Sequence, residues 1–525
     1  MDDQKKRWSR RATLGALGVG GALGVGGVLA VVGAAKRRDQ RGGKTRRRDP
    51  YYGGDAEPGT TVRAVWSAPT GGTSAVAWEN TRAGTAGFSL DGHRFSSDRA
   101  GQIVGYASAT SVEIGRDIDF HVSVAPAQRY RIQVYRVGHY NGVGGRLVAA
   151  SPWLDGRTQP APIVDARTRM VRCAWEAGWR LRVGRNWVSG YYLALLTNAA
   201  GWCRWVPFVV RDPRRAAAGL VIVPTSTYQA YNMWPGDGRT GASLYYGYNR
   251  LGRKVSNARA QAVSHDRPYS GTGIPSRADH DIGFTQWVER DGTDVTYATS
   301  EDLHTGRVQP HRYRAVIFCG HDEYWTVEMR RAVANARDRG TSLVFLAANN
   351  CYWRVRYGAT DGHPDERIVG CDKSGAYGGR PIPLTTQWRK AGSPEQELIG
   401  AQYVGTVDDP VPLVVQNSGH WFWAGTGVRD GDPIPGVVEG EADQRTDGAR
   451  VPRSKSDVLL AASPYTRNGK PQVQQTRLYQ APSGAWVFDA GSLGWTNALY
   501  AEGAADGRLQ RATRNLLDRV LNPSA

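Results

Sequence analysis

The chain of 525 residues is longer than the roughly 100 to 200 residues that one compact domain usually holds, so we expect two or three domains. Its 40% hydrophobic and 22% charged residues are ordinary globular values, which exclude a wholly disordered or fibrous chain. The net charge of +19 does not indicate nucleic-acid binding. Residues 1–49 alone carry thirteen Lys/Arg against four Asp/Glu, and the remaining surplus is spread without a long Lys/Arg run.

Residues 1–35 have the layout of a twin-arginine export signal. Arg10 and Arg11 precede an uncharged Gly/Ala/Val/Leu stretch that runs to Ala35. This stretch is long enough to span a bilayer, but its many glycines weaken both the helix and its hydrophobicity. We therefore expect export by the twin-arginine route to the cell surface or the medium. Contact with a membrane is expected only through an uncleaved leader.

Residues 36–62 are rich in Arg, Gly and Asp and poor in large apolar side chains, which is typical of a linker. The following segment, residues 63–212, has apolar residues with a period of two, clearest at residues 118–124 and 130–134. Further short apolar runs are separated by Gly-rich turns. This density of short strands predicts an Ig-like β-sandwich module.

Residues 213–525 show a different apolar pattern, which predicts strands that alternate with helices. Continuous apolar runs typical of buried parallel strands lie at residues 220–223, 315–318 and 343–346. Between the last two runs, Thr326 is suited to cap a helix that ends near Gly340. Another strand and two helices are expected at residues 295–297, 281–290 and 509–521. We therefore expect an α/β domain with a mainly parallel sheet, of the amidotransferase or flavodoxin type.

Polar and aromatic residues follow three of these runs, at residues 224–232, 319–325 and 348–353. Parallel α/β sheets bind ligands beyond the carboxyl ends of their strands, so these segments are the expected site. His321, Asp322 and Glu323 precede a helix N-terminus, whose dipole favours carboxylates; the alternative is that they only cap the helix. No P-C-x-x-C follows His321 and no H-E-x-x-H occurs, which disfavours standard zinc hydrolase sites.

The five cysteines form no C-x-x-C pair and no zinc spacing. In an exported protein, Cys173 with Cys203, or Cys351 with Cys371, are candidate disulfides, and the sequence does not choose between them. Cys319 follows a predicted strand, where a nucleophile of the amidotransferase kind would stand. It lacks the G-x-C-x-G turn that exposes such a sulfur, which favours a buried structural thiol.

Five segments in a fixed order carry a family resemblance. They lie at residues 227–232, 263–269, 320–325, 348–353 and 420–427. Together they resemble the C-terminal domain of the large (beta) subunit of N,N-dimethylformamidase, and the similarity extends over about residues 100–520. Five ordered motifs are far more specific than any one of them.

The resemblance implies hydrolysis of a small tertiary amide at a mononuclear ferric iron, held by two tyrosines and one glutamate. Matched by motif, the implied metal ligands are Tyr228, Tyr269 and Glu323. The implied catalytic or neighbouring groups are His321, Asn349 and Glu441, although the motif around Glu441 is altered. Two phenolates and a carboxylate are hard anionic donors that suit ferric iron and leave positions for water and a carbonyl oxygen.

The sequence therefore predicts an exported, iron-dependent hydrolase that acts on the C–N bond of a small-molecule amide. The alternative is a non-catalytic cell-surface or glycan-binding protein on a degenerate hydrolase scaffold, since its 18 Trp suit sugar stacking as well as a core. A third class is amide transfer that depends on Cys319. The family's enzyme has a longer large subunit and a separate small subunit, so a partner subunit and a homo-oligomer are left open. No nucleic-acid partner is expected.

Overall fold

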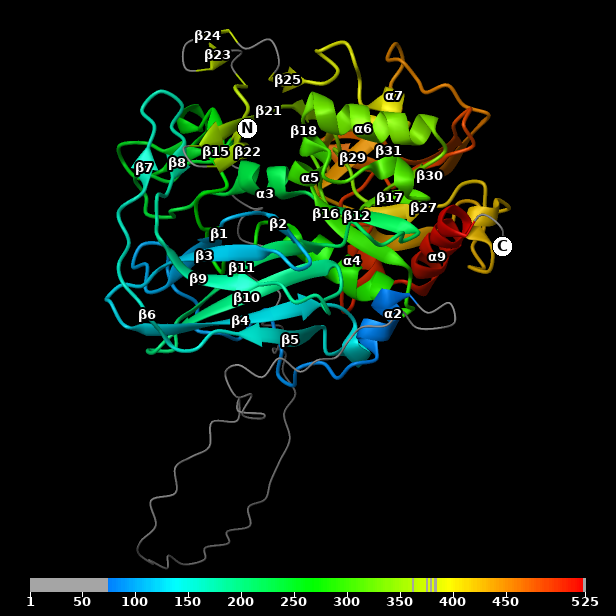
Figure 1. The fold of residues 1–525 in the computed structure, drawn as a ribbon. Coiled ribbons are helices and arrows are strands. Elements are labelled where there is room, and N and C mark those ends of the chain that lie inside the picture. The colour runs from blue at the N-terminus through cyan, green and yellow to red at the C-terminus, as the bar shows by residue number, and fades with distance from the viewer. Residues whose placement is uncertain (1–73, 361–362, 374–375, 378–379, 382–384, 523–525) are drawn as a thin grey trace, which may run out of the picture. The chain divides into compact units, whose positions relative to one another are not determined.

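The computed structural model describes residues 74–360, 363–373, 376–377, 380–381 and 385–522 (Figure 1). The predicted export leader (1–35) and basic linker (36–62) lie outside these residues. All the described residues belong to one compact unit. In the described part of the chain, no helix is long and apolar enough to cross a membrane.

The first part of the described chain consists of two β-sheets that share an apolar core. One sheet has the order β1 (Val104–Ala107), β3 (Asp117–Ser123), β9 (Ala177–Arg182). The other has the order β2 (Ser111–Glu113), β11 (Cys203–Arg211), β10 (Gly190–Asn198), β4 (Arg129–Val137), β5 (Gly145–Ala150), and β6 (Leu154–Asp155) pairs with β4. The alternating apolar residues of these strands fill the core, where Phe120 and Phe208 meet edge to face at 5.7 Å. A small hairpin is formed by β7 (Ile163–Val164) and β8 (Val171–Arg172).

A seven-stranded mixed sheet is built from the part of the chain that follows. Its order is β16 (Val295–Thr299), β12 (Gly219–Val223), β17 (Ala315–Phe318), β19 (Ser342–Phe345), β32 (Trp486–Asp489), β31 (Lys470–Gln480), β30 (Ser456–Arg467). Neighbours from β16 to β32 pair parallel, whereas β31 and β30 are antiparallel. The continuous apolar runs form the buried strands because both faces of this sheet are covered.

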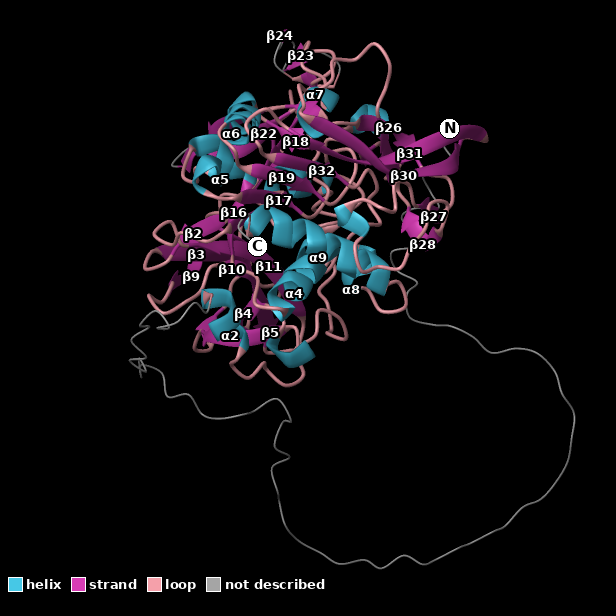
Figure 2. Cartoon of the chain, turned by 90° about the vertical axis from the view of Figure 1, so that its right-hand side faces the viewer, coloured by secondary structure: helices cyan, strands magenta, loops and turns pink. Residues whose placement is uncertain are grey.

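Helices are few, and most are short (Figure 2). They are α2 (Ala75–Asn80), α3 (Thr225–Tyr231), α4 (Ala278–Arg290), α5 (Ser300–Thr305), α6 (Val327–Asp338), α7 (Gln396–Ile399), α8 (Asn497–Tyr500) and α9 (Gly507–Leu521). Short 3-10 turns lie at η1 (Tyr140–Gly142), η2 (Ser256–Ala258), η3 (Pro310–Arg312) and η4 (Trp421–Trp423). The expected cap of α6 is confirmed, since Thr326 Oγ1 accepts a hydrogen bond from the Met329 amide at 3.2 Å.

The remaining strands form small sheets of two or three members. The three-stranded sheets are β15 (Ala262–Ser264), β22 (His363–Gly370), β21 (Arg356–Thr360), and β18 (Tyr324–Trp325), β20 (Trp353–Arg354), β25 (Thr386–Gln387). The two-stranded sheets are β13 (Gly247–Tyr248) with β14 (Lys254–Val255), β23 (Ala376–Tyr377) with β24 (Arg380–Pro381), β26 (Gln402–Thr406) with β29 (Glu441–Gln444), and β27 (Val411–Val414) with β28 (Pro433–Val438). All the two-stranded sheets are antiparallel.

The predicted fold class, a mainly parallel α/β domain of the amidotransferase or flavodoxin type behind an Ig-like sandwich, is therefore wrong. The protein is β-rich, with most of its strands in small mixed or antiparallel sheets. The reason lies after β19, where the chain stops alternating strand with helix. Antiparallel strands need no crossover helix between them, so β30 and β31 extend the large sheet as a hairpin and β21 and β22 pair next to each other in the chain.

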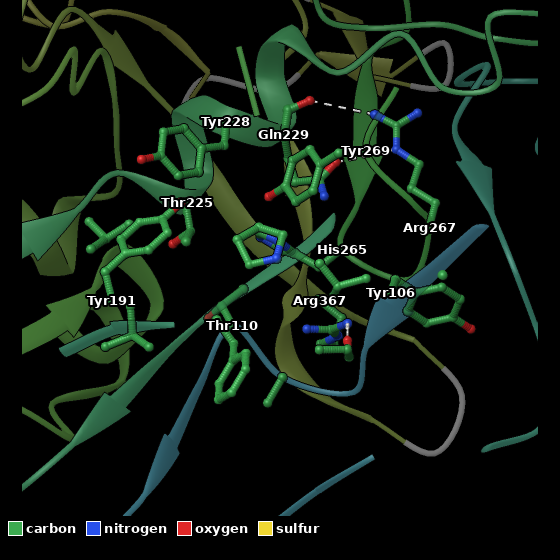
Figure 3. A pocket seen from close by; sticks show the side chains of 18 residues that line it. Tyr106, Thr110, Tyr191, Thr225, Tyr228, Gln229, His265, Arg267, Tyr269 and Arg367 are labelled. Atoms are coloured by element: carbon green, nitrogen blue, oxygen red, sulfur yellow. Dashed lines mark hydrogen bonds between the residues drawn. The ribbon is translucent and has the colours of Figure 1, made fainter. Parts of the chain in front are cut away.

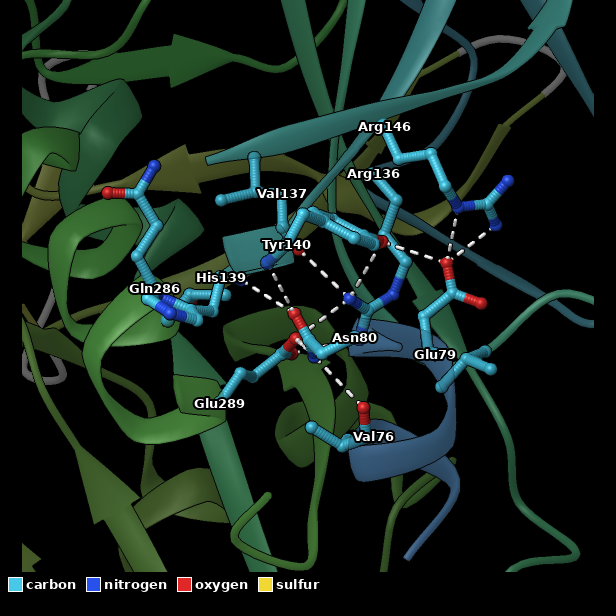
Figure 4. Close-up of polar contacts among 12 residues, drawn as sticks. Val76, Glu79, Asn80, Arg136, Val137, His139, Tyr140, Arg146, Gln286 and Glu289 are labelled. Atoms are coloured by element: carbon cyan, nitrogen blue, oxygen red, sulfur yellow. Dashed lines mark hydrogen bonds and ion pairs between the residues drawn. The ribbon is translucent and has the colours of Figure 1, made fainter. Parts of the chain in front are cut away.

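A buried ion pair joins the segments 63–212 and 213–525 within the described chain (Figure 4). Arg136 of β4 binds Glu289 of α4 through both terminal nitrogens, each at 2.8 Å from a carboxylate oxygen, and neither side chain is exposed. Asn80 of α2 donates to the same carboxylate at 2.8 Å, and Tyr297 of β16 donates to it at 2.9 Å. Elements distant in the sequence are thus fixed to one charged centre.

The five cysteines are all free and buried, so neither candidate disulfide is present. The thiol of Cys319 lies 3.3 Å from a carboxylate oxygen of Asp281 on α4. Burial raises the pKa of Cys319 well above its ordinary value, as expected of a structural thiol rather than a nucleophile.

Candidate functional site

Glu323 is held at the centre of a polar cluster by its own backbone. It follows the end of β17 and directly precedes β18, in the connection that leads into α6. The amides of Glu323 and Tyr324 both donate to Thr227 Oγ1 of α3, at 3.0 and 3.3 Å. Its side chain is therefore positioned by two elements, α3 and the strand connection, and is almost fully buried.

Two tyrosine hydroxyls converge on the Glu323 carboxylate. Tyr231, at the end of α3, donates to Oε2 at 2.8 Å. Tyr245, from the loop before β13, lies 2.7 and 2.8 Å from the two carboxylate oxygens. The two rings stack with their centroids 4.6 Å apart, and their hydroxyl oxygens are 3.1 Å apart. Two phenol hydroxyls and one carboxylate thus lie within hydrogen-bond distance of one another.

His321 stands beside this group with one ring nitrogen anchored and the other facing the carboxylates. Its Nδ1 lies 3.1 Å from the Ala348 carbonyl, which can only accept, so Nδ1 carries a proton. Its Nε2 lies 3.3 Å from Glu323 Oε2 and 3.6 Å from Glu441 Oε2. Burial opposes protonation, but these two carboxylates together raise the pKa of His321 above its ordinary value.

Asn349 and Glu441 complete the cluster on its far side. The Asn349 amide nitrogen donates to Glu441 Oε2 at 3.0 Å, and its backbone amide donates to Asp443 at 2.9 Å. Asn349 has a φ of 57°, a left-handed conformation that asparagine tolerates better than most residues. Its side-chain oxygen is buried and has no hydrogen-bond partner among the described residues. This oxygen is therefore available to a ligand.

The surroundings shift the pKa of the carboxylate and the pKa values of the two phenols in opposite directions. Burial opposes ionisation of Glu323, but the hydrogen bond and charge of His321, with Lys373 nearby, lower the pKa of Glu323. Burial and then the negative charge of Glu323 raise the pKa values of Tyr231 and Tyr245 well above normal. Both phenols are neutral in this arrangement, and only a strong Lewis acid would remove their protons at neutral pH.

The structure brings together four of the six predicted site residues, namely Glu323, His321, Asn349 and Glu441. It does not bring Tyr228 and Tyr269 to Glu323. The Tyr228 hydroxyl instead donates to Asp281 at 2.6 Å, and the Tyr228 and Tyr269 rings meet edge to face at 6.5 Å. Both rings line a separate cavity (Figure 3).

Tyr231 and Tyr245 stand where the two phenols were expected. Tyr231 lies inside the first of the five family segments, three residues after Tyr228, so this segment does supply a tyrosine that contacts Glu323. Tyr245 lies outside all five segments, and no local pattern marks it.

The donor set at Glu323 fits a trivalent metal ion of the kind expected. Two phenols already share one carboxylate, and a cation bound there would replace the phenol protons as the partner of all three oxygen groups. No cluster of three or more His, Cys, Asp or Glu side chains arranged for a metal occurs in the described part of the chain. A metal centre at this site would therefore depend on the tyrosines.

Comparison with known proteins gives one family and two relatives. The family model described as N,N-dimethylformamidase beta subunit-like, C-terminal, matches residues 131–507. The N,N-dimethylformamidase beta subunits of Alcaligenes sp and Paracoccus aminophilus are each 26% identical over 229 residues, which is 38% of this chain and 29% of either relative. A superoxide reductase (neelaredoxin) from Ignicoccus hospitalis matches 22% of this chain and 83% of its own at 10% identity, with a TM-score of 0.14. A TM-score this low bears on neither fold nor function.

Proposed function

The chain belongs to the N,N-dimethylformamidase beta subunit-like family, and from this membership and the site geometry we propose that it hydrolyses the C–N bond of small amides. The observation that carries the proposal is the convergence of Tyr231 and Tyr245 on Glu323, with His321 and Glu441 alongside. The matched segment spans less than a third of the relatives' length, so their substrate is not transferred to this chain.

Glu323, Tyr231 and Tyr245 are the residues that would hold a ferric ion. When bound, such an ion supplies Lewis acidity toward an amide carbonyl oxygen. This set replaces Tyr228 and Tyr269 by two tyrosines whose hydroxyls lie within 2.8 Å of the carboxylate. The support for iron is this choice of hard oxygen donors and the family membership.

The other residues supply proton transfer and orientation. Glu441 faces the same space as His321 and accepts a proton from the attacking water. His321 gives a proton from Nε2 to the departing amine nitrogen, while the Ala348 carbonyl holds the ring through Nδ1. Asn349 orients Glu441 through its amide nitrogen. Water adds to the carbonyl carbon, the C–N bond breaks, and the products are a carboxylic acid and an amine.

Export and subunit composition are further parts of the proposal. The twin-arginine pattern in residues 1–35 supports export of a folded, metal-loaded protein. The relatives are named as beta subunits, which supports a partner subunit for this chain too.

Two pairs of tyrosine variants test the metal site in the full chain. We expect about one iron per purified wild-type chain and a visible phenolate-to-iron absorption band. Tyr231→Phe and Tyr245→Phe should each shift or remove this band, whereas the matched variants Tyr228→Phe and Tyr269→Phe should leave it unchanged. Iron-free wild-type protein would contradict the metal centre. A band lost only in Tyr228→Phe and Tyr269→Phe would restore the ligand set implied by the motifs.

A further inference from the structure

Asn349 has a backbone conformation that its surroundings must hold in place. Its φ of 57° lies in the left-handed region, which is strained for any residue that has a β-carbon. Cys351, two residues later, has a φ of 54°, and both residues are buried. Neither position is a glycine, which would adopt this conformation without strain. The segment 348–353 therefore depends on tertiary contacts to keep its shape.

The backbone of segment 348–353 supports the cluster around Glu323. The Ala348 carbonyl lies 3.1 Å from His321 Nδ1 and fixes the orientation of that ring. The Tyr352 amide donates to the carbonyl of Glu323 at 2.9 Å. A shift of the segment would therefore displace two residues of the proposed active site, and small displacements of catalytic groups cost much activity.

Asp443 of β29 binds this segment at its strained residue. Its side chain is almost fully buried, and its Oδ1 accepts a hydrogen bond from the backbone amide of Asn349 at 2.9 Å. Asp443 is itself fixed, because its own amide donates to the Gly491 carbonyl at 3.0 Å. Glu441, two residues earlier on β29, accepts a hydrogen bond from the Asn349 side-chain nitrogen at 3.0 Å. Asn349 is thus bound to β29 through both its backbone and its side chain.

The hydrogen bond between Asp443 and the Asn349 amide is assisted by charge. Burial raises the pKa of Asp443, the bond from the Asn349 amide lowers it, and the negative charge of Glu441 raises it. A hydrogen bond that favours the ionised form of a carboxyl is in turn strengthened when that carboxyl ionises. Ionised Asp443 therefore holds the Asn349 backbone most firmly.

We propose that Asp443 is a positioning residue of the active site. It holds Asn349 in the left-handed conformation, in which the Asn349 side chain reaches Glu441. By the same hydrogen bond it keeps segment 348–353 in place beside His321. This role rests on the proposed function, because Asp443 acts only through the groups that carry out hydrolysis.

Hydrogen exchange of the full chain, read by mass spectrometry on peptides that cover residues 346–353, tests the anchor without a substrate. We expect slow exchange in the wild type. Asp443→Leu removes the acceptor and should speed exchange in this segment about tenfold, whereas Asp443→Asn keeps an oxygen acceptor and should change it about threefold or less. Asp489→Asn is the matched control, because Asp489 is also fully buried but accepts from the Gly491 amide at 3.1 Å. This control should exchange as the wild type does.

Steady-state hydrolysis of acetamide and N,N-dimethylformamide tests the positioning role. Asp443→Leu should lower kcat about 10- to 100-fold per folded chain and leave KM within about twofold, because Glu441 and His321 act in the chemical step. Asp443→Asn should recover most of the lost kcat, and Asp489→Asn should retain the wild-type value. A purely structural role would give neither the recovery nor the difference between the two aspartates.

Several outcomes would overturn the proposal. They are exchange of the wild-type segment as fast as that of an exposed loop, an unchanged exchange rate or an unchanged kcat in Asp443→Leu, and equal losses in Asp443→Leu and Asp443→Asn. Asp443→Ala also removes the acceptor and takes the place of Asp443→Leu if that variant fails to fold. If the wild type hydrolyses neither amide, the proposed function fails on its own, and the exchange rates alone decide whether Asp443 anchors Asn349.

Discussion

Two carboxylates, Glu289 and Glu323, are both buried but have different hydrogen-bond partners. Glu289 is closed by the bidentate guanidinium of Arg136 together with two neutral donors (Figure 4). Glu323 instead accepts hydrogen bonds from two phenols and stands beside a histidine. A permanent cation leaves a carboxylate with no capacity for a ligand, whereas protons on phenols and histidine are exchangeable. The first arrangement stabilises the fold, and the second is suited to chemistry.

The largest expected effect on stability comes from breaking the ion pair between Arg136 and Glu289. Arg136→Met should lower the free energy of unfolding by about 3–5 kcal/mol, because it leaves Glu289 buried without its cation. Chemical denaturation of the full chain measures this.

A double variant provides the control for that pair. Replacing both partners, as Arg136→Met with Glu289→Leu, removes the unpaired charge and should recover a large part of the loss. If Arg136→Met cost less than about 1 kcal/mol, comparable to an exposed ion pair, the buried pair would not be the centre that holds the two parts together.

A third buried carboxyl, Asp281, sharpens the comparison because no cationic side chain among the described residues forms an ion pair with it. Burial raises the pKa of Asp281 from 3.8 to about 7, and its partners are the hydroxyl of Tyr228 and the thiol of Cys319. Gly320 packs against the same carboxyl, so closely that a β-carbon there would overlap it. Between pH 4 and 7 the folded state keeps a proton that the unfolded state has lost. The free energy of unfolding should therefore fall as pH rises through this window, by roughly 2–4 kcal/mol from this group.

Asp281→Asn should flatten that pH dependence and stabilise the protein at pH 8, because the neutral amide has no charge to bury. Denaturation midpoints of the two proteins between pH 4 and 8 give the measurement. Parallel curves for wild type and variant would show that Asp281 ionises as freely when folded as when unfolded.

Substitutions in the cluster around Glu323 should change activity more than stability. Tyr245→Phe removes one hydroxyl from Glu323 and should lower amide hydrolysis about 100-fold, or roughly 2.7 kcal/mol in the activation free energy. The same change should cost only about 1 kcal/mol in unfolding, the value of one hydrogen bond. Tyr246→Phe, at the neighbouring position, is the matched control. Loss of folding equal to the loss of activity would make Tyr245 a structural residue like Arg136.

The smallest expected effect concerns a neutral hydrogen bond next to the site. Thr326→Ala removes the N-cap of α6, which begins shortly after Glu323, and should cost about 1 kcal/mol in unfolding. Thr326→Ser keeps the hydroxyl and serves as control. A loss as large as that of Arg136→Met would mean that neutral caps and buried charges contribute equally.

The local elements of this protein were readable from its sequence. The apolar runs at residues 220–223 and 315–318 are strands β12 and β17, and the amphipathic pattern after Thr326 is helix α6. These elements follow from side-chain periodicity and caps, which depend only on near neighbours in the chain. Glu323 and His321 were likewise recognisable, because a short motif carries both.

Only the tertiary structure decided which tyrosines meet Glu323 and how the sheets are completed. Tyr228 and Tyr231 are three positions apart on one helix, and the direction in which α3 packs sends the first to Asp281 and the second to Glu323. Tyr245 reaches the same carboxylate from a loop 78 residues away in sequence, a contact that no local pattern encodes. The order of the strands in the mixed sheet was likewise not readable from the sequence. The apolar pattern of a strand does not show which other strand it pairs with.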